Sequence, residues 1–184
     1  MRLIFFVFIF LVCGSKCSGA VELRPYVGVD YVASHFDVDN KYKYWKISYS
    51  SLNFNTGVYL SYDVGFELFY QDLGREVDKQ ASAIFNESKY HFKAYGLDVA
   101  KYFPVLEKTK IYSSIGIGKY QLNSKDEYRL NHKENLNGYR VGLGLQNDFF
   151  EKVSLRFSIR YIFMETNKFN NMGEFVFGVR YYFI

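Results

Sequence analysis

Gly178-Val179-Arg180-Tyr181-Tyr182-Phe183-Ile184, the last seven residues of the chain, alternate between two kinds of side chain. Successive side chains of an extended strand point to opposite faces. One face then carries Phe177, Val179, Tyr181 and Phe183. The other face carries Val176, Gly178, Arg180 and Tyr182. An aromatic face opposite a face with glycine and arginine is typical of a strand that has lipid on one side and a polar lumen on the other.

The same period of two residues occurs in seven more segments, each about 10 to 13 residues long, which suits tilted strands that cross a bilayer. They are residues 24–33, 52–62, 64–73, 91–103, 111–120, 138–147 and 153–163. Short connections are expected near Asp63, at 104–110 and at 148–152. Long connections are expected at 34–51, 74–90, 121–137 and 164–172. The sequence therefore predicts an all-β protein, an eight-stranded antiparallel up-and-down transmembrane barrel with its long loops at one end.

The polar faces of these segments carry as many acids as bases. They are Asp30, Glu67, Asp98, Glu174, Arg140, Arg156, Arg160 and Arg180. Unpaired charges in a tight lumen are costly, so we expect a paired interior network. A soluble eight-stranded carrier would turn the other face inward, but that face is too bulky for such an interior. The charges suit a structural plug, with a gate or ion path as the alternative.

The N-terminus has the features of a secretory signal peptide. Arg2 precedes an apolar run over residues 3–12, and Ser18-Gly19-Ala20 offers small residues for cleavage. The run is too short to cross a membrane as a helix. We expect residues 1–20 to be a cleaved signal peptide and residues 21–184 to form one outer-membrane barrel domain. Both cysteines would be removed with the signal peptide. The remaining net charge of about +2 is too small to indicate a nucleic-acid-binding protein.

The candidate catalytic residues are few. A lipid-modifying enzyme of the lipid A deacylase kind needs a histidine that activates a serine hydroxyl, oriented by an acid. His35, His91 and His132 are the only histidines, and none lies in a His-x-Ser pattern. We therefore predict surface histidines, no catalytic residue, no cofactor and no metal site. A lipid-modifying enzyme and a narrow porin-like channel remain the alternatives.

Lysines and aromatic residues interleave in the first long connection. The candidate contact residues are Lys41, Lys43, Tyr44, Trp45 and Lys46. Charge and ring stacking together suit an anionic glycan or a host protein. The alternative is an aromatic rim on a hairpin above the bilayer. Lys93 and Lys119 are expected at the outer rim, where they would meet lipid phosphates or simply keep the rim soluble.

Several motifs resemble the small outer-membrane β-barrel family, the OmpA-transmembrane-domain-like and Opa/OmpX-like surface proteins. They are Pro25-Tyr26-Val27-Gly28-Val29-Asp30-Tyr31, Ile115-Gly116-Ile117-Gly118, Val141-Gly142-Leu143-Gly144 and Gly178-x-x-Tyr181-x-Phe183. The resemblance implies that Gly178, Tyr181 and Phe183 form the signal read by the barrel-assembly machinery, although Val176 and Ile184 depart from its usual form. It implies a non-enzymatic surface protein of the bacterial outer membrane, whose partners are outer-membrane lipid and ligands of its four loops, such as a host protein or glycan.

Overall fold

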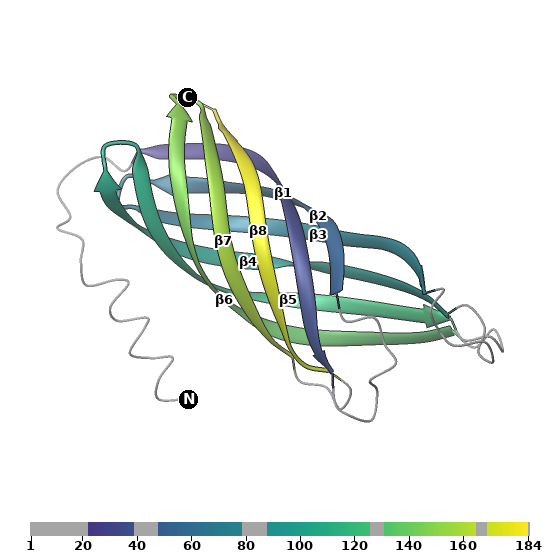
Figure 1. The fold of residues 1–184 in the computed structure, drawn as a ribbon. Coiled ribbons are helices and arrows are strands. Elements are labelled where there is room, and N and C mark those ends of the chain that lie inside the picture. The colour runs from purple at the N-terminus through teal and green to yellow at the C-terminus, as the bar shows by residue number, and fades with distance from the viewer. Residues whose placement is uncertain (1–21, 39–47, 79–87, 126–130, 165–168, 184) are drawn as a thin grey trace, which may run out of the picture.

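The computed structural model describes residues 22–38, 48–78, 88–125, 131–164 and 169–183. Their strands are β1 (Leu23–Val38), β2 (Ser48–Leu60), β3 (Val64–Asp78), β4 (Ser88–Leu106), β5 (Thr109–Lys125), β6 (Asn131–Phe150), β7 (Val153–Met164) and β8 (Phe169–Tyr182). Each strand pairs with its neighbours in sequence, and β8 closes on β1 to complete an antiparallel barrel (Figure 1). No helix with the length and hydropathy to cross a membrane occurs in these ranges. The predicted fold class is confirmed.

The two faces of the barrel wall differ as the alternation predicts. Large apolar side chains point outward on every strand and stay about half exposed, for example Phe54 at 50% and Leu143 at 62%. Charged and amide side chains of the same strands point inward and are buried. A soluble barrel would show the reverse, because water would drive the apolar side chains into its interior. The outer surface is therefore suited to lipid.

The strands are staggered around the barrel. A row of cross-strand partners that starts on β6 returns to β6 ten residues further along the chain. The row runs through Gly138, Gly118, Gly96, Phe69, Asn55, Gly28, Arg180, Ser154 and Asp148. Such a stagger requires strands that tilt against the barrel axis. The tilt brings side chains from distant rows to the same height inside the lumen.

The ends of several strands differ from the sequence prediction. The predicted long connections are too long, because β1 continues to Val38, β3 continues to Asp78 and β4 already begins at Ser88. β5 and β6 likewise extend to Lys125 and from Asn131. The connection predicted at 104–110 is also too long, since only two residues separate β4 from β5. Outside a bilayer both faces of a strand meet water, so the strand continues without the alternation that marks it in the sequence.

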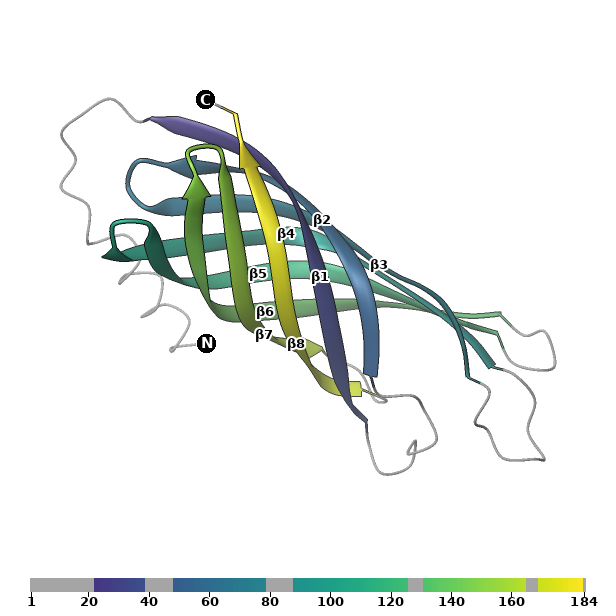
Figure 2. The ribbon, with the colours of Figure 1, turned by 45° about the horizontal axis from the view of Figure 1, so that its top comes forward.

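Four strands extend beyond the others at the long-connection end. The last residue of β3 that pairs with β2 is Asp72, and the first residue of β6 that pairs with β7 is Gly138. β3 nevertheless stays paired with β4 as far as Asp78, and β5 with β6 as far as Asn131. These outer parts of β3, β4, β5 and β6 form a protruding sheet, which Figure 2 shows running past β1, β2, β7 and β8.

Candidate functional site

The lumen is filled by three layers of side chains. A tyrosine layer lies at the short-turn end and consists of Tyr26, Tyr59, Ala100, Tyr102, Tyr112 and Tyr182. An apolar layer lies toward the long-connection end and consists of Phe69, Phe92, Ala94, Tyr120, Ile162, Met164 and Met172. The eight predicted interior charges are all buried, and they contact both layers: Arg156 lies over the Tyr112 ring and Arg140 over the Phe69 ring.

The central cluster joins the first strand of the chain to the last. Arg180 Nη1 donates to Asp30 Oδ1 at 2.6 Å, and Arg180 Nη2 donates to Glu67 Oε2 at 3.1 Å. Arg156 Nη1 and Nη2 donate to Glu67 Oε2 and Oε1, both at 3.0 Å, and Nη2 lies 3.8 Å from Asp30 Oδ2. Such two-point contacts fix the geometry as well as the charge. The four groups tie β1, β3, β7 and β8 together across the lumen.

Two further ion pairs lie beside the central cluster. Arg140 Nη2 is 3.2 Å from Asp98 Oδ2, and its guanidinium lies 3.7 Å from the centre of the Phe69 ring. Arg160 Nε is 3.0 Å from Glu174 Oε2, whose other oxygen accepts a hydrogen bond from Gln71 at 3.0 Å. Every one of the eight charges therefore has a partner of opposite sign. This neutrality matters because an uncompensated buried charge costs several kcal/mol.

Amide and hydroxyl groups complete the contacts of the central carboxylates. Asn53 and Asn55 donate to Asp30 Oδ2 at 2.8 and 3.0 Å, and Tyr26 donates to Glu67 Oε2 at 2.9 Å. Sequence reasoning missed these partners. Their signal was present, since all three lie on the same inward faces as the charges.

Glycines make room for the charges. Seven of the eight charged residues have a glycine as a direct cross-strand partner, and the exception, Glu174, pairs with Ser34 and Arg160. A Cβ added at Gly116 would collide with the carboxylate of Asp98, and one at Gly178 would collide with that of Asp30. A facing residue without a side chain therefore gives most of the charged side chains their space in the narrow lumen.

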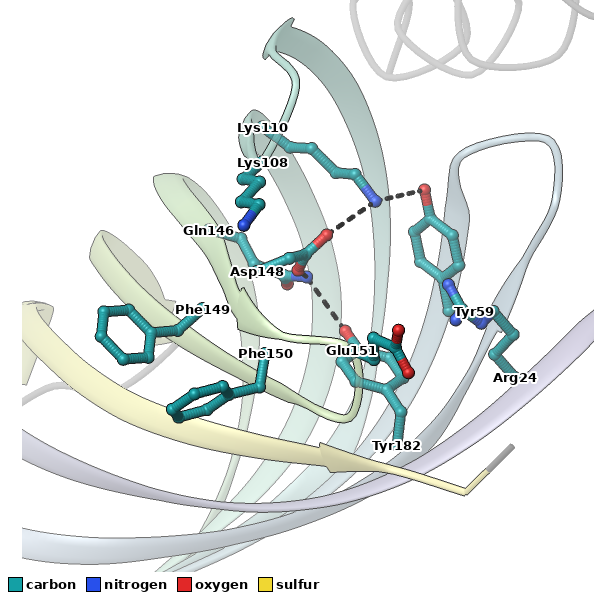
Figure 3. A pocket seen from close by; sticks show the side chains of 10 residues that line it. All are labelled: Arg24, Tyr59, Lys108, Lys110, Gln146, Asp148, Phe149, Phe150, Glu151 and Tyr182. Carbon is teal, nitrogen blue, oxygen red and sulfur yellow. Dashed lines mark hydrogen bonds and ion pairs between the residues drawn. The ribbon is translucent and has the colours of Figure 1, made fainter.

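A recess of about 580 Å³ opens at the short-turn end (Figure 3). Lys110 Nζ lies 3.3 Å from Asp148 Oδ2 and 3.3 Å from the Tyr59 hydroxyl, and Figure 3 shows it reaching between them. Gln146 Nε2 donates to the Tyr182 hydroxyl at 3.0 Å. Tyr59 and Tyr182 belong to the tyrosine layer, so the recess ends where that layer begins. It is an entrance to a filled lumen.

The three histidines lie on three different strands. His35 is exposed on β1, and its Nδ1 lies 3.0 Å from Ser48 Oγ on β2. His91 and His132 occupy β4 and β6, at backbone positions that pair with β5, and their side chains lie outside the described residues. The contact between His35 and Ser48 was missed because these residues meet only through strand register. The described residues contain no cluster of histidine, cysteine and carboxylate suited to a metal ion.

The other candidate residues fall in two places. Tyr181 and Phe183 point outward at the end of β8 with ring centres 5.4 Å apart, while Gly178 faces the lumen. The predicted signal peptide at 1–20 lies outside the described residues. The same holds for the candidate loop residues Lys41, Lys43, Tyr44, Trp45 and Lys46.

Comparisons with known proteins agree on the architecture. The model of a family described as outer membrane protein beta-barrel domain matches residues 4–183. Neisserial surface protein A is similar with a TM-score of 0.62 at 14% identity, over 90% of this chain and 100% of that one. Ail, the attachment invasion locus protein of Yersinia pestis, is similar with a TM-score of 0.61 at 16% identity, over 88% and 99%. Its complex with the heparin analogue sucrose octasulfate gives 0.59 at 15% identity, over 90% and 100%. No curated protein matches by sequence.

Proposed function

Because the chain belongs to the outer membrane protein beta-barrel domain family, we propose that it is a non-enzymatic surface protein of the bacterial outer membrane. In this proposal the barrel is an anchor that also supports the integrity of the envelope. The protruding sheet and the four long connections face the surroundings, since such barrels keep their short turns in the periplasm. Their role is adhesion to a host or to another surface.

The observation that carries this proposal is the contrast between the lumen and the protruding sheet. The lumen is filled with side chains, and each of its eight charges has a partner of opposite sign inside it. Among the described residues, the protruding sheet has two edges, on β3 beyond Asp72 and on β6 before Gly138, where pairing with β2 and β7 has stopped. Edge strands present free backbone N–H and C=O groups to which a partner strand can add.

The class of ligand is proposed from the sequence together with one relative. Ail is a relative whose complex with a heparin analogue is known. In this chain, Lys41, Lys43 and Lys46 alternate with aromatic residues in the connection between β1 and β2. Sulfated sugars carry dense negative charge and apolar ring faces, which lysine and aromatic side chains bind together. An anionic glycan is therefore the ligand that we propose for this end.

Binding of whole cells to heparin-coated surfaces and to host cells tests the proposal. A trimmed variant replaces residues 75–91 and 123–134 by two-residue Asn-Gly turns, which removes most of the protruding sheet and keeps the barrel. We expect the trimmed variant to lose binding to host cells, and K41Q/K43Q/K46Q to lose binding to heparin. The matched control is K108Q/K152Q at the opposite end, which should bind as the wild type does.

Heat-dependent gel mobility shows whether each variant has folded, since a closed barrel resists detergent until it is boiled. If folded trimmed barrels still bind host cells as strongly as the wild type, the protruding sheet is not the contact surface. If the triple lysine variant retains full binding to heparin, the glycan is contacted elsewhere or not at all.

A second candidate function has one observation in its favour. The contact between His35 and Ser48 is exposed at the long-connection end, and a histidine can activate a serine hydroxyl for attack on an ester. We expect the mass profile of lipid A to be the same in cells with and without the protein. Deacylation that is present in the wild type and abolished by both H35A and S48A would replace our proposal by a lipid-modifying enzyme. H35A/H91A/H132A extends the test to all histidines.

A further inference from the structure

A groove of about 530 Å³ runs over the outside of β4, β5 and β6, on the surface that faces lipid. Its walls include Tyr95, Leu97, Ile117, Lys119, Asn137 and Tyr139. It is separate from the lumen and from the recess at the short-turn end, whose linings come from inward-facing side chains and from the turns.

The floor of the groove is bare backbone. Gly96, Gly118 and Gly138 are direct cross-strand partners at inward-facing positions, so the outer surface of this row is backbone that lies between outward side chains of the same strands. On the lumen side, the ring of Phe69 packs against Gly96 and Gly118, where an added Cβ would come within 2.8 and 2.9 Å of it. The glycines therefore make room for the Phe69 ring in the lumen, and on the outside the groove is bounded by the outward side chains next to this row.

The two ends of the groove differ in chemistry. Lys119 and Asn137 are cross-strand partners at the end nearer the long connections. Leu97 and Ile117 lie deeper, toward the middle of the barrel wall. Where side chains are described, no carboxylate lies within 4 Å of Lys119, whereas the nearby Lys93 has Asp72 at 3.7 Å. Among the side chains that the structure describes, Lys119 is therefore the cation of the groove, and it lies above an apolar trough.

We propose that this groove binds one acyl chain of an anionic phosphate-bearing lipid in the outer leaflet, with Lys119 contacting the phosphate. An acyl chain fits the apolar trough, and a flexible lysine stem can follow that surface while its ammonium group stays at the headgroup level. Tyr95 and Tyr139 flank the trough, as expected of aromatic residues at a membrane interface.

Lipid retention measured by native mass spectrometry tests the headgroup contact. The wild-type barrel is placed in nanodiscs of equal parts phosphatidylglycerol and phosphatidylcholine, and the lipid that remains bound after release is identified. We expect phosphatidylglycerol to be enriched, and K119Q to reduce that enrichment about fivefold, as for the loss of one cation near a charged surface. The matched control, K93Q, should change little because Lys93 already has a carboxylate partner.

A second pair of variants tests the groove itself. I117W fills the trough and should reduce the retention of both lipids, whereas I159W places the same ring on β7, away from the groove. The two isoleucines are comparably exposed, at 59% and 52%. Lipid A replaces phosphatidylglycerol in a parallel arm, and excess inorganic phosphate should displace neither lipid.

Equal enrichment in K119Q and K93Q overturns the headgroup contact, and equal retention in I117W and I159W overturns the groove. Displacement by free phosphate would reduce the site to a simple anion site. All four substitutions lie on the outer surface, and heat-dependent mobility confirms that each barrel is closed. If the I117W barrel does not close, the comparison of K119Q with K93Q alone tests the proposal.

Discussion

At the scale of single residues, the carboxylates of Asp30 and Asp98 fit the lumen because a glycine stands opposite each of them. The inward faces of the strands, read from the sequence, were enough to name all eight charges. They were not enough to name the ion pairs. Glu67 on β3 and Arg156 on β7 meet only because the stagger of the strands brings them to one height. Such a register is set by the whole barrel.

The first prediction concerns the space that glycine leaves. Gly116→Ala places a methyl group against the Asp98 carboxylate and should destabilise the barrel by about 1–3 kcal/mol, the usual cost of overpacking. Gly173→Ala is the matched control, because nothing lies within 4 Å of its added Cβ. Urea unfolding in a defined bilayer compares the two. Equal midpoints would mean that the lumen rearranges freely around the extra methyl group.

The second prediction concerns the central ion cluster. Glu67→Ala removes one of the two carboxylates that Arg156 and Arg180 share and leaves an uncompensated positive charge. It should cost about 3–5 kcal/mol, as expected when one member of a buried ion pair is removed. Glu151→Ala, in an exposed turn, should stay within about 0.5 kcal/mol of the wild type. The same unfolding measurement applies. A loss below about 1 kcal/mol would show that water enters the lumen and solvates the arginines.

At the scale of the strand, alternation identified all eight strands but not their full lengths. The pattern is clear where lipid faces one side of a strand and the lumen faces the other. It fades in the protruding sheet, for instance over residues 75–78 on β3, as expected for a part of a strand that extends beyond the bilayer. The layers of the lumen were also not predicted, since Phe69 and Tyr120 follow the inward pattern without showing which end they close.

The third prediction concerns the outward aromatic residues at the end of β8. Y181A/F183A should lower the amount of heat-modifiable barrel in cells severalfold and leave refolding of the purified protein in detergent unchanged, since a recognition signal acts only where the assembly machinery is present. F175A/F177A is the matched control on the same outward face of the same strand. If both double variants lose assembly equally, hydrophobicity alone explains the effect, and the terminal residues are no signal.

At the scale of the whole molecule, the lumen is closed twice, by the tyrosine layer at one end and by the apolar layer at the other. The charges between them are neutralised by one another. An ion that entered would have to leave its hydration shell and displace an ion pair as well. The two closures and the paired charges together favour the structural plug over the gate.

The fourth prediction is therefore electrical. Planar-bilayer recordings of the wild-type barrel should show no resolvable unitary conductance. F69A/I162S/M172S replaces three large side chains of the apolar layer by small or polar ones. If either protein conducts ions, we expect the larger conductance in this variant. L68A/I159S/L143S makes comparable changes on the outer surface and serves as its control. Steady ion-selective steps from the wild-type protein would favour the channel.

The contact between Asp30 and Arg180 bears on the timing of assembly. Asp30 lies on the first strand and Arg180 on the last, 150 positions apart in the chain. While β8 is still absent, the carboxylate of Asp30 lacks its 2.6 Å partner and keeps two neutral amide donors, with the charge of Arg156 more distant at 3.8 Å. A barrel with seven strands in place thus holds a poorly compensated charge inside an apolar membrane. Release of the barrel from its assembly site should therefore await the final strand, so that neutralisation and ring closure are one event.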